Sequence, residues 1–326
     1  MNVRPEKPFE GLSVGLSLKI EAIAVEAEGI LSLVLTNAGD APLPPWRPGA
    51  HIDLMLPNGM TRQYSLCGDP AERGKWRIGV LLAPDSRGGS KFIHANLRPG
   101  DVVETAGPRN NFPLVEADHY LFIAGGIGIT PILPMIRQLS AEGRRWTLLY
   151  GGRTERSMAF VNEIGACPGG EVHLVPQDKQ GLLDLKRFLS NHEPGRVAYC
   201  CGPGPLIDAV EAECLAWPSG ALHRERFAPR ERPASVEDGE FEVELARSGR
   251  TLRVPADESL LSVLEDAGYK IDNSCRAGIC GTCLLKVLGG APEHNDDLLD
   301  DEQRESGTVI LPCVSRSMTK ILVLDL

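Results

Sequence analysis

Four cysteines near the carboxyl end constrain this chain more than any other feature. In "NSCRAGICGTC", residues 273–283, Cys275, Cys280 and Cys283 have the spacing C-x4-C-x2-C, and Cys313 follows in "ILPCVSRS". The other five of the nine cysteines are scattered along the chain. Because an odd and unevenly spaced set is not typical of a disulfide framework, the cluster is better interpreted as a metal-binding loop in a reducing compartment.

The spacing also separates one kind of metal site from another. A zinc site normally has paired C-x2-C units, and only the second gap here has that form. The plant-type [2Fe–2S] pattern is C-x4-C-x2-C with a distant fourth cysteine, and glycines such as those in "RAGICGTC" suit a loop that wraps around a cluster. The four cysteines therefore predict a [2Fe–2S] cluster, with a zinc knuckle or buried structural thiols as the alternatives. Four of the remaining cysteines are expected to be small buried side chains: Cys67, Cys167, Cys200 and Cys214.

Composition bounds the classes of protein to consider. The 326 residues are 42% hydrophobic and 24% charged, which is ordinary for a globular protein of two or three domains. The first ten residues have no apolar signal segment, and the longest apolar run, residues 121–136, is broken by glycine and proline. We therefore expect a cytoplasmic protein without a membrane span. The net charge of −10 argues against nucleic-acid binding, which needs clustered Lys and Arg.

Three segments differ in their hydrophobic pattern, and each predicts a domain. Residues 1–113 alternate apolar and polar positions over short runs such as "WRIGVLL", which predicts an antiparallel β-barrel. Residues 114–228 alternate strand-like runs with helical periods, which predicts a parallel α/β sheet. The polar, proline-bearing residues 229–238 are expected to be a linker. Residues 239–326 have strands and a short helix of their own.

Two features of the first segment predict a phosphate-bearing ligand. In "RQYSLCGDP", Arg62, Tyr64 and Ser65 at alternating positions of a strand offer a cation, a flat stacking face and a hydrogen bond for a ring edge. Farther along, the "GGS" of residues 88–90 precedes the helical "KFIHANL", so its amides can hold a phosphate. The alternative is an ordinary strand with a glycine turn.

The second segment carries two turns at strand ends. "LFIAGGIGITP" runs from an apolar strand through glycines into a helix that Thr130 can cap, with Pro131 in its first turn. Such a turn lets backbone approach a pyrophosphate, although it is not the G-x-G-x-x-G fingerprint. "YCCGPGP" places Cys201 at the carboxyl end of another strand, where open α/β sheets bind ligands. We expect this end to line a nicotinamide pocket, the alternative being a rigid strand-to-helix turn.

Taken in this order, the motifs resemble the phthalate dioxygenase reductase family, which includes vanillate O-demethylase reductases, over nearly the whole chain. The resemblance implies an FMN-binding barrel, an NAD domain like that of ferredoxin–NADP reductase, and a β-grasp ferredoxin domain. For FMN it implies Arg62, Gln63, Tyr64, Ser65, Gly88, Gly89 and Ser90, with Arg62 and Ser90 on the phosphate, Tyr64 stacked on the ring and Ser65 near its reactive edge. For NAD it implies Gly126, Gly128, Thr130, Pro131, Arg153, Cys201, Gly202 and Pro203, and it places Glu225 and Phe227 of "RERFAP" close to the flavin. The implied cluster ligands are Cys275, Cys280, Cys283 and Cys313.

The three cofactors together predict a function. A nicotinamide gives two electrons as hydride and a [2Fe–2S] cluster accepts one at a time, so a flavin must stand between them and no acid or base residue is assigned. We expect an NADH-dependent reductase component that passes electrons to a separate Rieske-type oxygenase, an aromatic ring dioxygenase or an O- or N-demethylase. The chain has no pair of Cys-x-His motifs of the Rieske kind, which supports a separate oxygenase.

Three alternatives stay open at this level. An FAD-containing monooxygenase reductase usually carries its ferredoxin segment first, and a non-enzymatic iron–sulfur carrier would bind no flavin. NADPH is the alternative to NADH, because Arg153 and Arg156 can meet a 2′-phosphate and no NAD-selective acidic residue is evident. Residues 239–326 hold 16 acidic and 9 basic side chains, a balance of −7. This acidic face is predicted to dock the oxygenase, the alternative for "NDDLLDDEQRE" being a solvated surface.

Overall fold

The computed structural model describes residues 15–39, 41–84, 86, 88–230 and 239–326. Most of the predicted linker, residues 231–238, and the start of the predicted first domain, residues 1–14, lie outside the described residues. The chain divides into two compact units, Met1–Gly202 with Ala209–Arg224 and Pro203–Asp208 with Glu225–Leu326. The units are described separately below.

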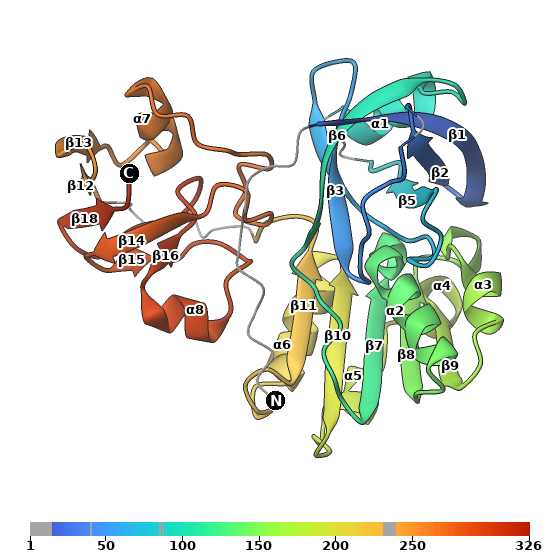
Figure 1. The fold of residues 1–326 in the computed structure, drawn as a ribbon. Helices are drawn as coiled ribbons and strands as arrows, with labels where there is room; N and C mark the ends of the chain where they lie inside the picture. Colours follow the sequence, from blue (N-terminus) through green and yellow to red (C-terminus); the bar gives the residue numbers. More distant parts are fainter. Residues whose placement is uncertain (1–14, 40, 85, 87, 231–238) are drawn as a thin grey trace. The chain divides into compact units, whose positions relative to one another are not determined.

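The first unit begins with a six-stranded antiparallel sheet in the order β4-β3-β6-β1-β2-β5 (Figure 1). A bridge between Leu66 and Ile78 joins the residue after β4 to β5, and so links the two edges into a barrel. The strands are β1 (Leu16–Ala27), β2 (Ile30–Asn37), β3 (Ala50–Met55), β4 (Thr61–Ser65), β5 (Trp76–Leu81) and β6 (Val102–Asn110). Alternate strand residues such as Leu33, Leu35 and Ile52 fill the barrel, as their period of two predicts.

The same unit continues into a parallel sheet in the order β11-β10-β7-β8-β9. Its strands are β7 (His119–Gly125), β8 (Trp146–Gly152), β9 (Gly170–Pro176), β10 (Arg196–Gly202) and β11 (Leu222–Arg226), the last of which runs into the second unit. The core beneath it is rich in aromatic side chains, and the T-shaped contact of Phe112 with Tyr199, 5.3 Å between ring centroids, joins the barrel's exit segment to β10.

Helices follow most of these strands. They are α1 (Gly89–Asn96) on the barrel, then η1 (Gly126–Gly128), α2 (Ile129–Ala141), η2 (Glu155–Ser157), α3 (Val161–Gly165), α4 (Gln177–Gln180), α5 (Leu185–Leu189) and α6 (Gly204–Glu213). Helix α5 begins at Leu185, because the side chain of Asp184 caps it by accepting from the amide of Arg187. No helix in the described ranges is long and apolar enough to cross a membrane.

The second unit is an α+β fold around the sheet β13-β12-β18-β14-β16, in which β12 and β18 run parallel. Its strands are β12 (Phe241–Leu245), β13 (Arg250–Val254), β14 (Leu285–Gly289), β15 (Pro292–Glu293), β16 (Val309–Ile310), β17 (Arg316–Ser317) and β18 (Ile321–Leu324), and its helices are α7 (Leu260–Asp266) and α8 (Asp301–Ser306). The apolar face of α7 packs with Val243 and Leu322 in one core. The loop between α7 and β14 carries Cys275, Cys280 and Cys283, and Cys313 lies between β16 and β17. This arrangement is a β-grasp fold.

Candidate functional site

Arg62 on β4 lies beside the glycine turn that begins α1. A Cβ built on Gly89 would come within 2.6 Å of Arg62 Cγ, and one on Gly88 within 2.7 Å of Met60 Cε. Gly88 also has φ +97°, which L side chains rarely adopt. Glycine at both positions therefore lets a guanidinium approach the amides at the positive end of α1, and this combination fits a phosphate.

Ser90 stands in the first turn of the same helix. Its hydroxyl donates to Ser86 Oγ at 2.9 Å and accepts from the amide of Ala83 at 3.2 Å. Ser90 therefore ties the turn to the end of β5. Its predicted contact with phosphate stays a prediction.

The four consecutive residues of the β4 motif do not share one face. Arg62 and Tyr64 pair across the strand gap with Leu54 and Ile52, whose side chains fill the barrel core. Gln63 and Ser65 stand on the other face, so the expectation that Ser65 alternates in phase with Arg62 and Tyr64 is wrong. Burial raises the pKa of the Tyr64 phenol, which keeps it neutral.

The opposite face of β4 belongs to a buried polar cluster that the sequence patterns did not predict. Asp53, 3% exposed, accepts from Gln63 Nε2 at 2.9 Å and from Arg109 Nη2 at 2.5 Å. His51, 6% exposed, faces Ser65 in the strand register. Burial, helped by the positive charge of Arg109, lowers the pKa of His51 to about 4, so the imidazole is neutral. These polar contacts hold one face of β4, and the other face of the strand packs on the barrel core.

The two predicted turns of the parallel sheet meet each other. A Cβ on Gly128 would come within 2.1 Å of the carbonyl oxygen of Cys201 and 2.7 Å of the amide nitrogen of Gly202. Only glycine permits this approach of the turn after β7 to the end of β10. Gly126 has φ +53° and no atom near its missing Cβ, so the turn exposes backbone at the carboxyl edge of the sheet. That edge suits a dinucleotide.

Thr130 does not cap α2, contrary to the sequence-based expectation. The 3-10 turn η1 runs directly into α2, so the N-cap is Gly128 and the helix begins before Thr130. The Thr130 hydroxyl instead donates to the carbonyl of Ile127 at 2.9 Å, the local bond that threonine makes inside helices. Pro131 does stand in the first turn, as predicted.

The remaining predicted residues lie at strand ends. Arg153 follows β8, the neighbour of β7, and its side chain is exposed, as is that of Arg156. Pro203 begins the second unit directly after Gly202. Glu225 lies in β11 and Phe227, 42% exposed, follows that strand.

Glu163 is a second residue that sequence reasoning missed. Its carboxylate accepts hydrogen bonds from Nη1 and Nη2 of Arg77 on β5, at 2.9 and 2.8 Å, and also contacts Arg137 of α2. Arg77 stacks over the Phe160 ring at 4.9 Å. The carboxylate therefore joins the barrel to the helix that starts at the nucleotide turn, within one unit. The partners are 86 positions apart in the sequence, and no local pattern pairs them.

The four predicted cluster cysteines form two pairs of thiols. Cys275 shares a hydrogen bond with Cys280, and Cys283 shares one with Cys313. The bond from Cys275 lowers the pKa of Cys280 to about 5, and the bond from Cys283 lowers that of Cys313. In the described part of the chain, no group of three or more His, Cys, Asp or Glu side chains is arranged so that it could hold one metal ion. Two pairs suit two irons with two thiolates each, and so fit a [2Fe–2S] cluster better than one zinc ion.

The loop that carries the thiols is shaped by its glycines. Gly278 and Gly281 have φ +69° and +73°, and a Cβ on Gly278 would come within 2.6 Å of Val314 beside Cys313. Backbone amides point at sulfur, from Ala277 to Cys275 at 3.3 Å and from Thr282 to Cys280 at 3.5 Å. Such amides stabilise thiolates, as a cluster requires.

The cysteines outside the loop behave mostly as predicted. Cys67, Cys200 and Cys214 are buried. Cys167 is only half-buried, because its thiol reaches the carbonyl of Glu163 at the surface of α3.

Two family models match the chain. Residues 243–318 match the 2Fe-2S iron-sulfur cluster binding domain, and residues 122–212 match the oxidoreductase NAD-binding domain. With the barrel that precedes them, these matches define an iron–sulfur oxidoreductase that uses a pyridine nucleotide.

Relatives narrow the class. The chain is 44% identical to the phenoxybenzoate dioxygenase subunit beta of Ectopseudomonas oleovorans, over 95% of this chain and 97% of the relative. It is 42% identical to the vanillate O-demethylase oxidoreductase of Pseudomonas putida (94% and 100% covered) and 40% identical to the phthalate dioxygenase reductase of Burkholderia cepacia (95% and 97% covered). The chain belongs to the phthalate dioxygenase reductase family.

Solved structures agree. Phthalate dioxygenase reductase, described as a modular structure for electron transfer from pyridine nucleotides to [2Fe-2S], matches with a TM-score of 0.68 and 39% identity over 96% of this chain and 98% of that one. An intact type IV self-sufficient cytochrome P450 monooxygenase matches with a TM-score of 0.90 and 34% identity over 99% of this chain. This chain spans only 43% of the P450 chain's length. The predicted fold class is confirmed, and so, through the family, are the predicted FMN, pyridine-nucleotide and [2Fe–2S] cofactors.

Proposed function

We propose that this chain is the reductase component of a two-component oxygenase system, and that it passes electrons from NADH through FMN and a [2Fe–2S] cluster to a Rieske-type oxygenase. The observation that carries the proposal is the pairing of Cys275 with Cys280 and of Cys283 with Cys313 in a chain that also has a nucleotide turn. When bound, the flavin would accept hydride from NADH and give the electrons singly to the cluster.

The barrel's geometry supports the proposed roles of the flavin-binding residues. Arg62 and the amides of residues 88–90 would hold the FMN phosphate, with the Ser90 hydroxyl as a further donor. Tyr64 would present its ring to the isoalloxazine. Gln63, bonded to Asp53, would hold the strand in place so that Ser65 reaches the flavin's edge from the strand end.

The carboxyl edge of the parallel sheet supports the proposed roles of the nucleotide-binding residues. The backbone of Gly126 and Gly128 and the start of α2 at Thr130 and Pro131 would contact the pyrophosphate. Cys201, Gly202 and Pro203 would line the nicotinamide pocket, with Arg153 toward the far ribose. Glu225 and Phe227 would lie near the flavin. NADPH is the alternative electron donor. Arg153 and Arg156 favour it, because their positive charges suit a 2′-phosphate.

The domain boundaries are also proposed here: 1–113, 114–228, a linker at 229–238, and 239–326. We place the protein in the cytoplasm, because the thiolates that would bind the cluster need a reducing compartment. Limited proteolysis with mass spectrometry tests the linker, since cleavage should concentrate in residues 229–238.

The test of the proposed partner is a mixing experiment. The protein is reduced anaerobically with NADH and mixed in a stopped-flow instrument with an oxidised Rieske-type oxygenase from a related two-component system. Rapid reoxidation of the cluster, weakening as salt is raised, supports docking on the acidic ferredoxin part. No reoxidation by any Rieske-type oxygenase tested would contradict the proposal.

A haem-containing partner is the second candidate. A relative from Ectopseudomonas mendocina, 38% identical over 97% of this chain, is named heme-dependent oxidative N-demethylase beta subunit. The same mixing experiment is therefore repeated with an oxygenase that contains haem. Faster reoxidation of the cluster by this protein than by the Rieske-type oxygenase would favour the second candidate.

A further inference from the structure

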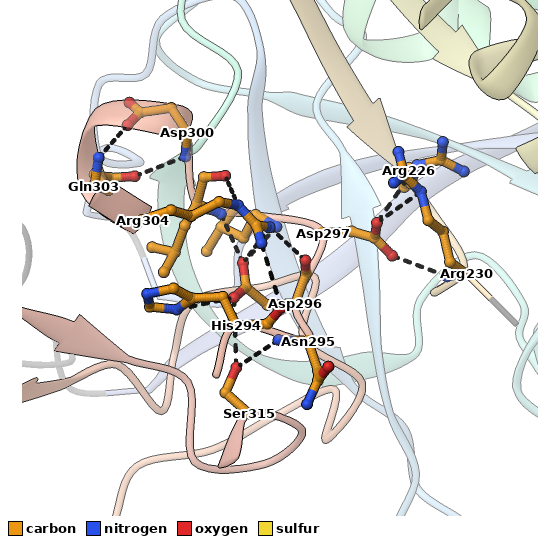
Figure 2. A network of polar contacts seen from close by, with 12 residues as sticks. Arg226, Arg230, His294, Asn295, Asp296, Asp297, Asp300, Gln303, Arg304 and Ser315 are labelled. Carbon is orange, nitrogen blue, oxygen red and sulfur yellow. Dashed lines mark hydrogen bonds and ion pairs between the residues drawn. The ribbon is translucent and has the colours of Figure 1, made fainter. Parts of the chain in front are cut away.

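Two neighbouring aspartates in the segment before α8 point to different partners (Figure 2). The side chain of Asp296 is fully buried and accepts from the amides of Leu298 and Leu299, at 3.0 and 2.8 Å, and from Arg304. The side chain of Asp297, 9% exposed, turns instead toward Arg226 and Arg230. Because Asp296 fixes the backbone here, Asp297 is presented in one direction.

Four charged side chains form one network of ion pairs around Arg226 and Arg230, and we call this network the latch: Asp208, Arg226, Arg230 and Asp297. Arg230 approaches Asp297 Oδ1 through Nε at 3.2 Å and donates its backbone amide to Oδ2 at 2.9 Å. Arg226 Nε lies 3.7 Å from Oδ1, and its Nη2 lies 2.5 Å from Asp208 in α6. The Arg226 side chain is only 3% exposed, so both of these carboxylates offset a buried charge. All four residues belong to the second unit.

The latch continues into the cysteine loop. The backbone amide of Asp297 donates to the carbonyl of Gly278 at 3.0 Å, two residues before Cys280. A Cβ on Gly278 would come within 3.1 Å of Asp296 Cα, so the two loops are in close contact. Polar contacts therefore run from α6, which directly follows the predicted nicotinamide loop, through Arg226 and Asp297 to the loop that would hold the cluster.

We propose that Asp297 is a positioning residue for electron transfer into the [2Fe–2S] cluster. With Arg226 and Arg230 it holds the cysteine loop against the segment that leaves β11, so that the loop that would carry the cluster keeps one conformation. Each transfer would move one electron from reduced flavin to the oxidised cluster, and over two transfers the single proton that came with the hydride would leave to solvent. This inference rests on the proposed function. It concerns how the cysteine loop is held rather than which cofactors are present.

The test uses Asp297→Asn in the full chain with its cofactors. Anaerobic stopped-flow with NADH resolves flavin bleaching from cluster reduction. We expect flavin bleaching to be unchanged and cluster reduction to slow about tenfold, because small displacements of reacting groups have large effects on rate. Trypsin should cleave after Arg230 about fivefold faster, since its guanidinium and amide lose the Asp297 carboxylate, while Asp208 stays 3.7 Å from the guanidinium Nε. Asp297→Glu keeps the charge and should restore both measurements in part.

Asp301→Asn is the matched control, because it removes the same charge from an exposed position four residues away. If Asp297→Asn matches this control in cluster reduction and in tryptic cleavage, the proposal is wrong. Should Asp297→Asn lose its cluster, Arg230→Gln replaces it, since Arg230 lies on the segment after β11 and is not itself part of the cysteine loop. Unchanged cluster reduction in that variant would equally overturn the proposal. Failure of NADH to bleach the wild-type flavin would count against the proposed function instead, while the cleavage rate still tests the latch.

Discussion

Gly128 lies so close to Cys201 that a Cβ on the glycine would stand 2.1 Å from the cysteine's carbonyl oxygen. The contact brings together the turn after β7 and the end of β10, the two places where the sequence predicts a nucleotide. Their fit depends on backbone alone, so it should be sensitive to a single methyl group.

We therefore expect Gly128→Ala to push these turns apart. The KM for NADH should rise about tenfold or more, with a smaller change in kcat, because in the proposed function the turn binds the dinucleotide and takes no part in the chemistry. Steady-state kinetics with an artificial electron acceptor measure this. Gly165→Ala, where no atom lies within 4 Å of the new Cβ, is the control and should leave KM unchanged. Equal KM values in the two variants would contradict the role given to Gly128.

Glu163 should stabilise the contact between the barrel and α2. Glu163→Gln leaves Arg77 and Arg137 without a full counter-charge in a half-buried contact, and we expect a loss of about 1–3 kcal/mol in the free energy of unfolding. Urea denaturation followed by tryptophan fluorescence measures it. Glu155→Gln removes an exposed ion pair with Lys179 and should leave the same free energy nearly unchanged. A Glu163→Gln variant as stable as this control would show that the carboxylate does not hold the two parts together.

Cys313 should be indispensable for the cluster although it is 30 positions from Cys283. Cys313→Ser should lower bound iron from about two atoms per chain to a small fraction of that, because one of the four thiolates is lost. Iron analysis and the visible spectrum measure this directly. Cys214→Ala, which alters a buried thiol outside the loop, should retain full iron content. Undiminished iron in Cys313→Ser would mean that another residue is the fourth ligand.

His51 should make the barrel sensitive to acid. Its pKa is lowered from 6.5 to about 4 in the folded chain, so between these pH values the unfolded state binds a proton that the native state does not. Stability therefore falls as the pH drops from 6.5 toward 4, by about 3 kcal/mol at the lower end. Urea midpoints at pH 7.5 and 5.0 should differ more for the wild type than for His51→Gln. The same pH dependence in both proteins would assign the effect to other groups.

The sequence predicted what local patterns encode. The cysteine spacing and the glycine turns identify their sites because each lies within a dozen residues, apart from Cys313, and the strand periods predicted the three folds. Long-range partners were out of reach, as the pairing of Glu163 with Arg77 and of Asp53 with Arg109 shows. Thr130 was misplaced because the turn η1 starts α2 early.

The acidic segment before α8 shows the same limit. Its run of aspartates is typical of a solvated face, yet Asp296 and Asp297 are satisfied inside the protein by Arg304, Arg226 and Arg230. Charge counting cannot tell an ion pair from a free carboxylate. Asp301 and Glu302 at the start of α8 are, by contrast, exposed.

Anaerobic titration of the purified protein with NADH tests the central claim most directly, with visible absorption and low-temperature electron paramagnetic resonance recorded at each addition. The account predicts that flavin absorption bleaches and that the signal of a one-electron-reduced [2Fe–2S] cluster then grows. A colourless protein that contains zinc, shows no such signal and leaves NADH unoxidised would contradict it.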